Sequence, residues 1–174
     1  MKKYIGLVLV AMSGCILTVN AQQSFSYKNP LLPTELRVND LLGRMTLEEK
    51  IAQIRHLHSW DVFDGQILNQ EKLDKMCGGI GYGFFEGFPL TAASCRKTFR
   101  EIQTYMVEKT RLGIPGFPVA ESLHGVVHEG TTIYPQNIAM GSTFNPELAY
   151  EKTKHIAGEL NTMGVKQVVA PCID

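Results

Sequence analysis

Two carboxylates follow short apolar segments that are typical of buried strands. Glu121 comes directly after residues 117–120, and Asp174 follows the apolar segment 165–170. Because the loops at the carboxyl ends of parallel strands converge over the mouth of a βα-barrel, both positions are candidates for a site. Two carboxylates could act as the acid and the nucleophile of a glycosidase. Capping of the next helix or binding to the backbone is at least as common a role for an isolated acidic residue.

A second group of candidates is formed by histidines. His124 and His128 are four residues apart, with Glu121 close by, and on a helix they would share a face and could bind zinc. Gly125 and the β-branched pair 126–127 disfavour a helix, and the HExxH order is absent. We therefore expect structural or substrate-contacting roles rather than a metal site.

Other residues offer weaker signals. The histidines at 56 and 58 are expected on opposite faces of their element, and no function is assigned to them. Several aromatic side chains could stack on sugar rings, although a place in the core is the more common role for any one of them. They are Trp60, Tyr82, Phe84, Phe85 and Tyr134.

Composition and charge exclude several classes of protein. The 174 residues are 44% hydrophobic and 20% charged, which is ordinary for a globular chain and unlike a disordered or disulfide-rich one. The 17 basic residues are balanced by 17 acidic ones, which argues against a nucleic-acid partner. Of the later cysteines, Cys77, Cys95 and Cys172, we expect buried, unpaired side chains rather than disulfides or zinc ligands.

The first 21 residues have the pattern of a secretory signal peptide. Lys2 and Lys3 precede an uncharged apolar stretch over 5–17, and Ala21 ends a signal-peptidase site. This stretch is too short to span a bilayer, and no membrane span is expected elsewhere. We predict a periplasmic or secreted protein. The alternative is a lipoprotein anchored through Cys15, which follows Ser13-Gly14.

Local signals then place the elements of the mature chain. Residues 22–35 are expected to form an extended leader, followed by a short helix over 36–42. A capping box at Thr46–Glu49 begins a helix that should reach His56. Apolar residues at helical spacing predict a helix over 91–111, with Cys95, Phe99, Ile102 and Met106 on its buried face.

The last predicted helix and the strands complete the pattern. Asn145-Pro146 should begin a helix that reaches Thr162 and is closed by Gly164, with Thr153 and Ala157 among the residues on its apolar face. Strands are expected over 78–85, 117–120 and 165–170. This alternation of strands and helices predicts an α/β fold built from parallel βαβ units.

Four segments together resemble glycoside hydrolase family 3, in its β-glucosidase and β-xylosidase branch. They cover nearly all of 36–174 in the family's order: LLGRMTLEEKIAQ at 41–53, RLGIP at 111–115 with ESLHG at 121–125, YPQNIAMGSTFNPEL at 134–148, and APCID at 170–174. The resemblance implies a retaining exo-acting glycosidase on a (β/α)8 TIM barrel, without a cofactor. Its substrates would be terminal β-linked glucose or xylose in oligosaccharides or plant polysaccharides.

The resemblance also revises the roles of the carboxylates. In the family the nucleophile and the acid/base lie further along the chain, beyond residue 174. Glu121 matches the acidic residue that holds hydroxyls of the sugar in the −1 subsite, where a carboxylate can accept charge-assisted hydrogen bonds. His124 and Asp174 would be additional substrate contacts, and Asp174 is not assigned catalysis. The length of the Glu121 side chain would crowd a 6-hydroxymethyl group, which favours pentosides.

Neighbouring branches and other functions remain as alternatives. The β-N-acetylhexosaminidase branch is disfavoured, because its Asp-x-Glu-Gly-Gly segment is replaced by ESLHG at 121–125. Without the first 21 of its 174 residues the chain keeps 153, whereas a (β/α)8 barrel needs about 250. We therefore expect residues 36–174 to form about half a barrel that is inactive by itself. The rival functions are a non-catalytic carbohydrate-binding module or pseudo-enzyme, and a metal-dependent hydrolase using Glu121, His124 and His128.

Overall fold

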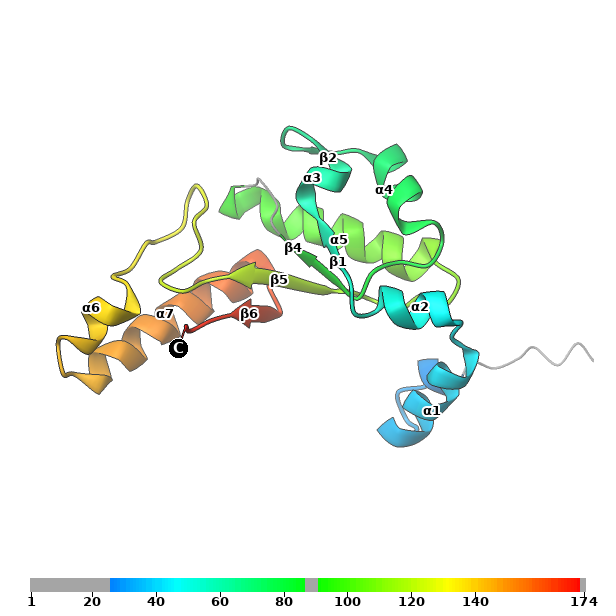
Figure 1. The fold of residues 1–174 in the computed structure, drawn as a ribbon, viewed down its shortest axis with the longest axis horizontal. Helices are drawn as coiled ribbons and strands as arrows, with labels where there is room; N and C mark the ends of the chain where they lie inside the picture. Colours follow the sequence, from blue (N-terminus) through cyan, green and yellow to red (C-terminus); the bar gives the residue numbers. More distant parts are fainter. Residues whose placement is uncertain (1–25, 87–90, 173–174) are drawn as a thin grey trace, which may run out of the picture. The chain divides into compact units, whose positions relative to one another are not determined.

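The computed structural model describes residues 26–86 and 91–172 (Figure 1). The predicted signal peptide, Cys15 and Asp174 lie outside the described residues. The chain divides into two units, Met1–Gly43 and Arg44–Asp174.

The described part of the first unit is a short turn held on a helix. A 3-10 turn (Ser26–Lys28) precedes helix α1 (Thr34–Arg44), which contains the helix predicted over 36–42 and begins inside the predicted leader. The backbone N–H of Tyr27 donates to the Asp40 carboxylate at 3.0 Å. The Nε–H of Arg37 in turn donates to the Tyr27 carbonyl at 2.9 Å. These two bonds connect the turn to one face of α1.

The second unit is built on a four-stranded sheet whose order is β1-β4-β5-β6, with all neighbours parallel. The strands are β1 (His56–His58), β4 (Phe84–Glu86), β5 (Phe117–Glu121) and β6 (Gln167–Val169), and a separate antiparallel hairpin joins β2 (Phe63–Asp64) to β3 (Ile67–Leu68). Each strand of the sheet lies beside the one before it, and helices occupy every connection. That is the order of successive βα units in a barrel, whereas a doubly wound sheet reverses direction. The predicted α/β fold with parallel βαβ units is therefore confirmed.

Six helices accompany these strands in the described part of the second unit: α2 (Leu47–Ala52), α3 (Ser59–Val62), α4 (Gln70–Cys77), α5 (Ala92–Lys109), α6 (Asn137–Gly141) and α7 (Pro146–Met163). The two long ones, α5 and α7, contact each other and run along the sheet (Figure 1). A side-chain N-cap begins each of these helices. The Thr91 side chain accepts the backbone N–H of Ser94 at the start of α5, and the Asn145 side chain accepts the backbone N–H of Leu148 at the start of α7. Gly164 closes α7 in the left-handed conformation, as predicted.

The core lies between the sheet and these two long helices. Leu57 of β1 and Phe85 of β4 are fully buried there, and Phe85 meets Phe99 of α5 edge-on at 5.5 Å between ring centroids. All four residues of the predicted apolar stripe of α5 are buried, and so are Ile156, Leu160 and Met163 of α7. Apolar burial on this scale is the main driving force for folding of the unit.

Three sequence predictions need correction. The glycine-rich segment 78–85 is a strand only from Phe84, because Gly78 ends α4 in the left-handed conformation and Gly79 and Gly81 also have positive φ. Helix α2 ends at Ala52 rather than near His56, where β1 already begins. On α7 the buried face contains Lys152, whereas Thr153 and Ala157, which are predicted to lie on that face, are exposed.

Lys152 is buried because its stem packs in the fold while its ammonium group reaches two oxygens. Its Nζ donates to the Pro135 carbonyl at 3.0 Å and to the Asn137 side chain at 2.7 Å. Burial lowers the pKa of Lys152 below its ordinary value. The lysine thus connects α7 to the start of α6, a role that a charged residue does not reveal in the sequence.

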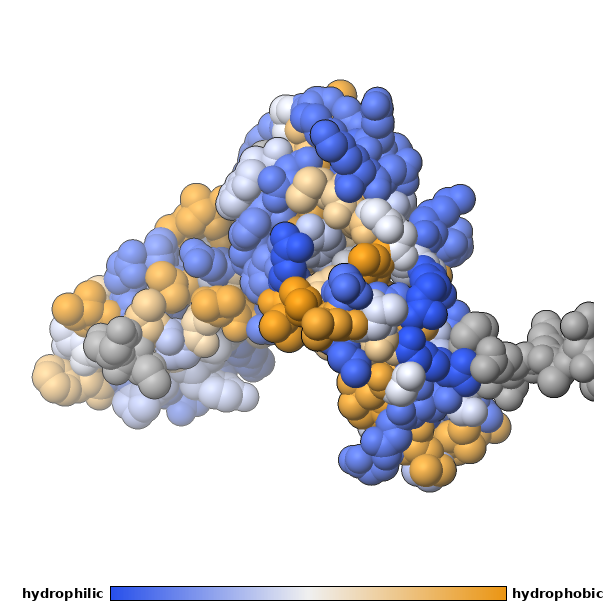
Figure 2. Space-filling view, turned by 45° about the vertical axis from the view of Figure 1, so that its right-hand side comes forward, coloured by the Kyte–Doolittle hydropathy of each residue, from blue (hydrophilic) through white to orange (hydrophobic). Residues whose placement is uncertain are grey.

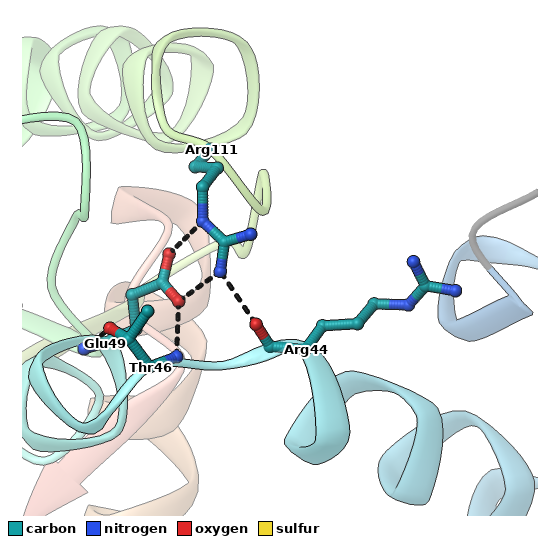
Figure 3. Close-up of polar contacts among 4 residues, drawn as sticks. All are labelled: Arg44, Thr46, Glu49 and Arg111. Carbon is teal, nitrogen blue, oxygen red and sulfur yellow. Dashed lines mark hydrogen bonds and ion pairs between the residues drawn. The ribbon is translucent and has the colours of Figure 1, made fainter. Parts of the chain in front are cut away.

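A buried carboxylate connects α2 to the segment that leads into β5 (Figure 3). The predicted capping box is present: the Thr46 hydroxyl accepts the Glu49 N–H, and Glu49 Oε2 accepts the Thr46 N–H at 2.8 Å. Arg111 also donates to both carboxylate oxygens, from Nε at 2.7 Å and Nη2 at 2.5 Å, and to the Arg44 carbonyl at 2.8 Å. This fork-to-fork geometry joins residues 62 positions apart.

The surface combines polar regions with apolar patches (Figure 2). Exposed apolar side chains in the second unit include Ile54, Phe117, Val168 and Val169. Within residues 26–86 and 91–172, no helix is both long and apolar enough to cross a membrane.

Candidate functional site: a cavity at the carboxyl ends of the strands

The face of the sheet opposite the core carries a row of aromatic rings. His56, Phe84 and Phe117 are paired in register on β1, β4 and β5, so their side chains point the same way. The His56 and Phe84 rings stack with centroids 5.1 Å apart, and those of Phe84 and Phe117 stack at 5.9 Å. Along each strand, these rings come before the polar residues at the carboxyl end.

Two residues further along, His58 and Glu86 are paired on the same face. Glu86 Oε1 lies 2.9 Å from Nδ1 of His56 and 3.5 Å from Nδ1 of His58. The second contact does not have hydrogen-bond geometry, and the buried His58 Nδ1 has no hydrogen-bond partner among the described residues. The expectation that the two histidines face opposite ways is wrong, because residues i and i+2 of a strand share a face.

A cavity of about 390 Å³ opens at these strand ends. Its polar lining comes from His58, Glu86, Glu121 and His128, with Trp60 of α3 beside them. Its apolar lining includes Cys95 and Phe99 of α5 and Met163 of α7. A concave site with a mainly apolar lining and a few convergent polar groups is typical of small-molecule binding.

Glu121 is the last residue of β5, opposite Val169 of β6. Its side chain is exposed, and within the described residues it makes no hydrogen bond or ion pair. Helix α6, the next helix, has Gln136 at its N-cap, so Glu121 does not cap it. The alternative role of capping or backbone binding is therefore not the one this carboxylate has. It remains available to a ligand in the cavity.

The other predicted site residues are placed differently. Asp174 lies outside the described residues, so its expected role as a substrate contact stays a prediction. His124 is half-buried, and its carbonyl accepts the Tyr134 N–H at 2.7 Å. It does not contribute to the cavity lining, although its Nδ1 is buried and finds no hydrogen-bond partner in the described part of the chain.

His128 lines the cavity, and burial lowers the pKa of its imidazole. A neutral imidazole can bind metals, but this requires further ligands at the same point. Across residues 26–86 and 91–172 no three His, Cys, Asp or Glu side chains are grouped to hold a metal ion. The metal-dependent hydrolase therefore gains no support from Glu121, His124 and His128.

Sequence reasoning missed Glu86, the second carboxylate of the cavity. The sequence predicts one strand over 78–85 and assigns no role to the acidic residue directly after it. The signal was nevertheless the one that identified Glu121, an acidic residue at the end of a short apolar segment. Trp60 was among the aromatic candidates, and the structure places it at the cavity.

The described cysteines are all free, and we expect only one of them to react in the native protein. Cys77 and Cys95 are buried, whereas Cys172 is exposed, which differs from the expectation that it is buried. Burial raises the pKa of Cys77 to about 12 and that of Cys95 to about 11, so their reactive thiolates are scarce at neutral pH. Labelling with a thiol reagent near neutral pH, mapped by peptide mass spectrometry, should mark Cys172 first. Cys77 and Cys95 should react only in denaturant; rapid native labelling of either would contradict this placement.

Comparison with known proteins assigns this chain to a family. The model of the glycosyl hydrolase family 3 N-terminal domain matches residues 46–174. A protein of Formosa agariphila described as a candidate β-xylosidase is 31% identical over 157 residues, which are 87% of this chain and 21% of that protein. A periplasmic β-glucosidase of Salmonella typhimurium is 26% identical over 174 residues, covering 99% of this chain and 21% of the relative.

A solved structure supports the same assignment. The structure of a β-glucosidase from Erythrobacter marinus superposes with a TM-score of 0.71 at 27% identity, over 88% of this chain and 20% of that one. The chain thus spans about a fifth of the length of the relatives that it matches. Since the family model covers most of the chain, the protein belongs to glycosyl hydrolase family 3, in the region of the family's N-terminal domain.

Proposed function

We propose that the protein serves in the retaining hydrolysis of terminal β-linked glucose or xylose, and that this chain supplies part of the sugar-binding site. The family assignment and the names of the relatives, a candidate β-xylosidase and a periplasmic β-glucosidase, support this reaction class. Retaining hydrolysis requires two carboxyl groups about 5–5.5 Å apart, one as nucleophile and one as acid/base. We assign neither role within residues 1–174, so the chain by itself should bind a glycoside without cleaving it.

Glu121 is the proposed contact to the hydroxyls of the terminal sugar in the −1 subsite. The observation that supports this role is its carboxylate, which lines the cavity without a hydrogen-bond partner among the described residues. A carboxylate accepts hydroxyl hydrogen bonds on both oxygens, and bonds to an ionised acceptor are stronger than neutral ones. His124 and Asp174 are proposed as further substrate contacts, although His124 is not among the residues that line the cavity.

The sugar is proposed to be a pentose rather than a hexose. Glu121 extends one methylene further than an aspartate would, and this length leaves less room for a 6-hydroxymethyl group. The proposal fits the relative from Formosa agariphila described as a candidate β-xylosidase. Release of glucose in preference to xylose from matched aryl glycosides by the active enzyme would argue against it.

Export is part of the proposal. The charged start, apolar stretch and Ala21 site of residues 1–21 favour cleavage and release into the periplasm or the medium. The naming of one relative as periplasmic agrees with this location. N-terminal sequencing of the exported protein should begin at Gln22, whereas a lipidated N-terminus at Cys15 would support the lipoprotein alternative.

Replacing Glu121 by glutamine should weaken glycoside binding by about 10- to 100-fold, because each hydrogen bond to a charged acceptor contributes about 1.5–3 kcal/mol. Calorimetry of the chain with methyl β-xylopyranoside and methyl β-glucopyranoside measures this loss. Glu108→Gln, which neutralises an exposed carboxylate on α5 outside the cavity, is the matched control and should bind as the wild type does. Equal binding by wild type and Glu121→Gln would remove Glu121 from the site.

A non-catalytic carbohydrate-binding protein is the second candidate, because the cavity, Glu121 and Trp60 all lie within the described chain. Assay of the protein with aryl β-xylosides and aryl β-glucosides separates the two. Binding with no release of the aryl group by any longer form of the protein would favour this second candidate.

A further inference from the structure

Trp60 combines two features that are rarely found together. It lines the cavity, and yet 70% of its surface is exposed. Large apolar side chains are normally buried, so an exposed indole at the mouth of a cavity indicates a binding surface. One face of the indole is already occupied, because it lies nearly parallel to the His58 ring, at 8° and with centroids 4.3 Å apart.

The indole is held in position by its neighbours in the chain. Trp60 lies in the four-residue helix α3, in which Ser59 and Val62 on either side are buried. His58, on which it stacks, is fixed in β1 and paired with Glu86 of β4. Because the backbone and one ring face are both constrained, the indole loses little conformational freedom when a ligand binds.

Glu86 offers a polar group beside this ring. Both of its histidine contacts are made through Oε1, at 2.9 Å from His56 and 3.5 Å from His58, whereas Oε2 is in no hydrogen bond or ion pair among the described residues. The carboxylate is therefore oriented by β1 and still has an oxygen that can accept a hydroxyl. An aromatic face next to an oriented carboxylate matches a pyranose, which has an apolar C–H face and hydroxyls at its edge.

We propose that Trp60, backed by His58, is a stacking platform for a sugar ring in this cavity, and that Glu86 accepts a hydroxyl of the same ring. This rests on the proposed function, which makes the ligand a glycoside. β-Glucosides and β-xylosides carry all their ring substituents equatorially, so both ring faces present axial C–H groups to an indole. The platform consequently favours these sugars over galactosides or mannosides, in which an axial hydroxyl interrupts one face.

The chain contains a single tryptophan, so its intrinsic fluorescence reports on Trp60 alone. Titration with methyl β-xylopyranoside should give a saturable blue shift as the ring covers the exposed indole, and methyl β-mannopyranoside should give a weaker response. By calorimetry, Trp60→Ala should bind methyl β-xylopyranoside about ten-fold more weakly, Trp60→Phe should recover part of the loss, and Glu86→Gln should also bind more weakly. Tyr150→Ala, which removes an exposed aromatic ring of α7, is the matched control and should bind normally.

The outcomes separate this inference from the proposed function. If calorimetry detects glycoside binding that depends on Glu121 while tryptophan emission and the affinity of Trp60→Ala are unchanged, the platform is wrong and the proposed function stands. If neither glycoside gives heat or an emission change in the wild-type chain, both are overturned. The wild-type titration needs no substitution, so a folding defect in a variant cannot obscure the result.

Discussion

Replacing Gly83 by alanine is expected to destabilise the second unit by at least about 3 kcal/mol. A Cβ built on Gly83 would lie 1.9 Å from the carbonyl oxygen of Gln53 and 2.5 Å from its carbonyl carbon, far inside contact distance. The backbone cannot move away easily, because the Gly83 N–H donates to the Ala52 carbonyl at 3.0 Å and its own carbonyl accepts the Phe117 N–H at 2.8 Å. Relieving the clash would therefore require α2 to move away from β4, or would break hydrogen bonds that connect this segment to α2 and β5.

Urea unfolding followed by circular dichroism measures this effect. The matched control is Gly158→Ala on the exposed face of α7, where an added Cβ meets nothing within 4 Å. That change should stabilise the protein by about 0.5–1 kcal/mol, because alanine is the better helix former. A Gly83→Ala protein as stable as the wild type would show that α2 does not approach β4 as described.

Replacing Arg111 by methionine is expected to cost about 2–4 kcal/mol at pH 7. Glu49 is only 4% exposed, so without the guanidinium its charge would remain buried with no ion-pair partner among the residues described. The Arg111 side chain is itself half exposed, which keeps the expected loss below that of a fully buried pair. Methionine keeps the unbranched stem, so the change chiefly removes the charge and the fork of donors.

The loss should depend on pH in a defined direction. Hydrogen bonds from Arg111 are the main reason that the pKa of Glu49 lies below its ordinary 4.5. A carboxyl with a lowered folded pKa stabilises the fold fully above its unfolded pKa, and this contribution disappears as the pH falls through the folded pKa. Without Arg111, burial is the largest remaining cause and raises the pKa of Glu49, so the difference in unfolding free energy between wild type and Arg111→Met should be constant near neutral pH and shrink as the pH falls through the folded pKa of the variant towards that of the wild type.

Denaturant unfolding at a series of pH values tests this directly. Arg100→Met is the control, because this exposed arginine of α5 makes no ion pair with a described residue, and it should change stability by less than about 0.5 kcal/mol at any pH. A penalty for Arg111→Met that persists unchanged at acid pH would mean that packing, rather than charge, explains the loss.

Local signals in the sequence predicted the elements well where a few neighbouring residues decide the structure. The capping box at Thr46, the start of α7 at Asn145 and its closure at Gly164 all depend on side chains that bond within one turn. The segment 78–85 misled the prediction, because alternating β-formers suggested a strand where glycines with positive φ form a turn. Periodicity describes side chains and is silent about the sign of φ.

The site was predicted only in part because its residues converge through strand register. Glu121 could be recognised one residue after its strand, and the family resemblance gave it a role. The approach of His56 and His58 to Glu86 depends on β1 pairing with β4, across a connection that holds two helices and a hairpin. No sequence signal fixes such a register, so the approach of Glu86 to the two histidines is visible only in the structure.

The sheet order β1-β4-β5-β6 also has a consequence for how the protein is made. Each strand pairs with the strand of the sheet that was synthesised just before it, so every new segment meets a partner that already exists. Contacts between successive segments close short loops, which form faster than distant pairings. The second unit can therefore assemble from its N-terminal edge while the chain is still emerging, with α5 and then α7 covering each strand pair as it forms.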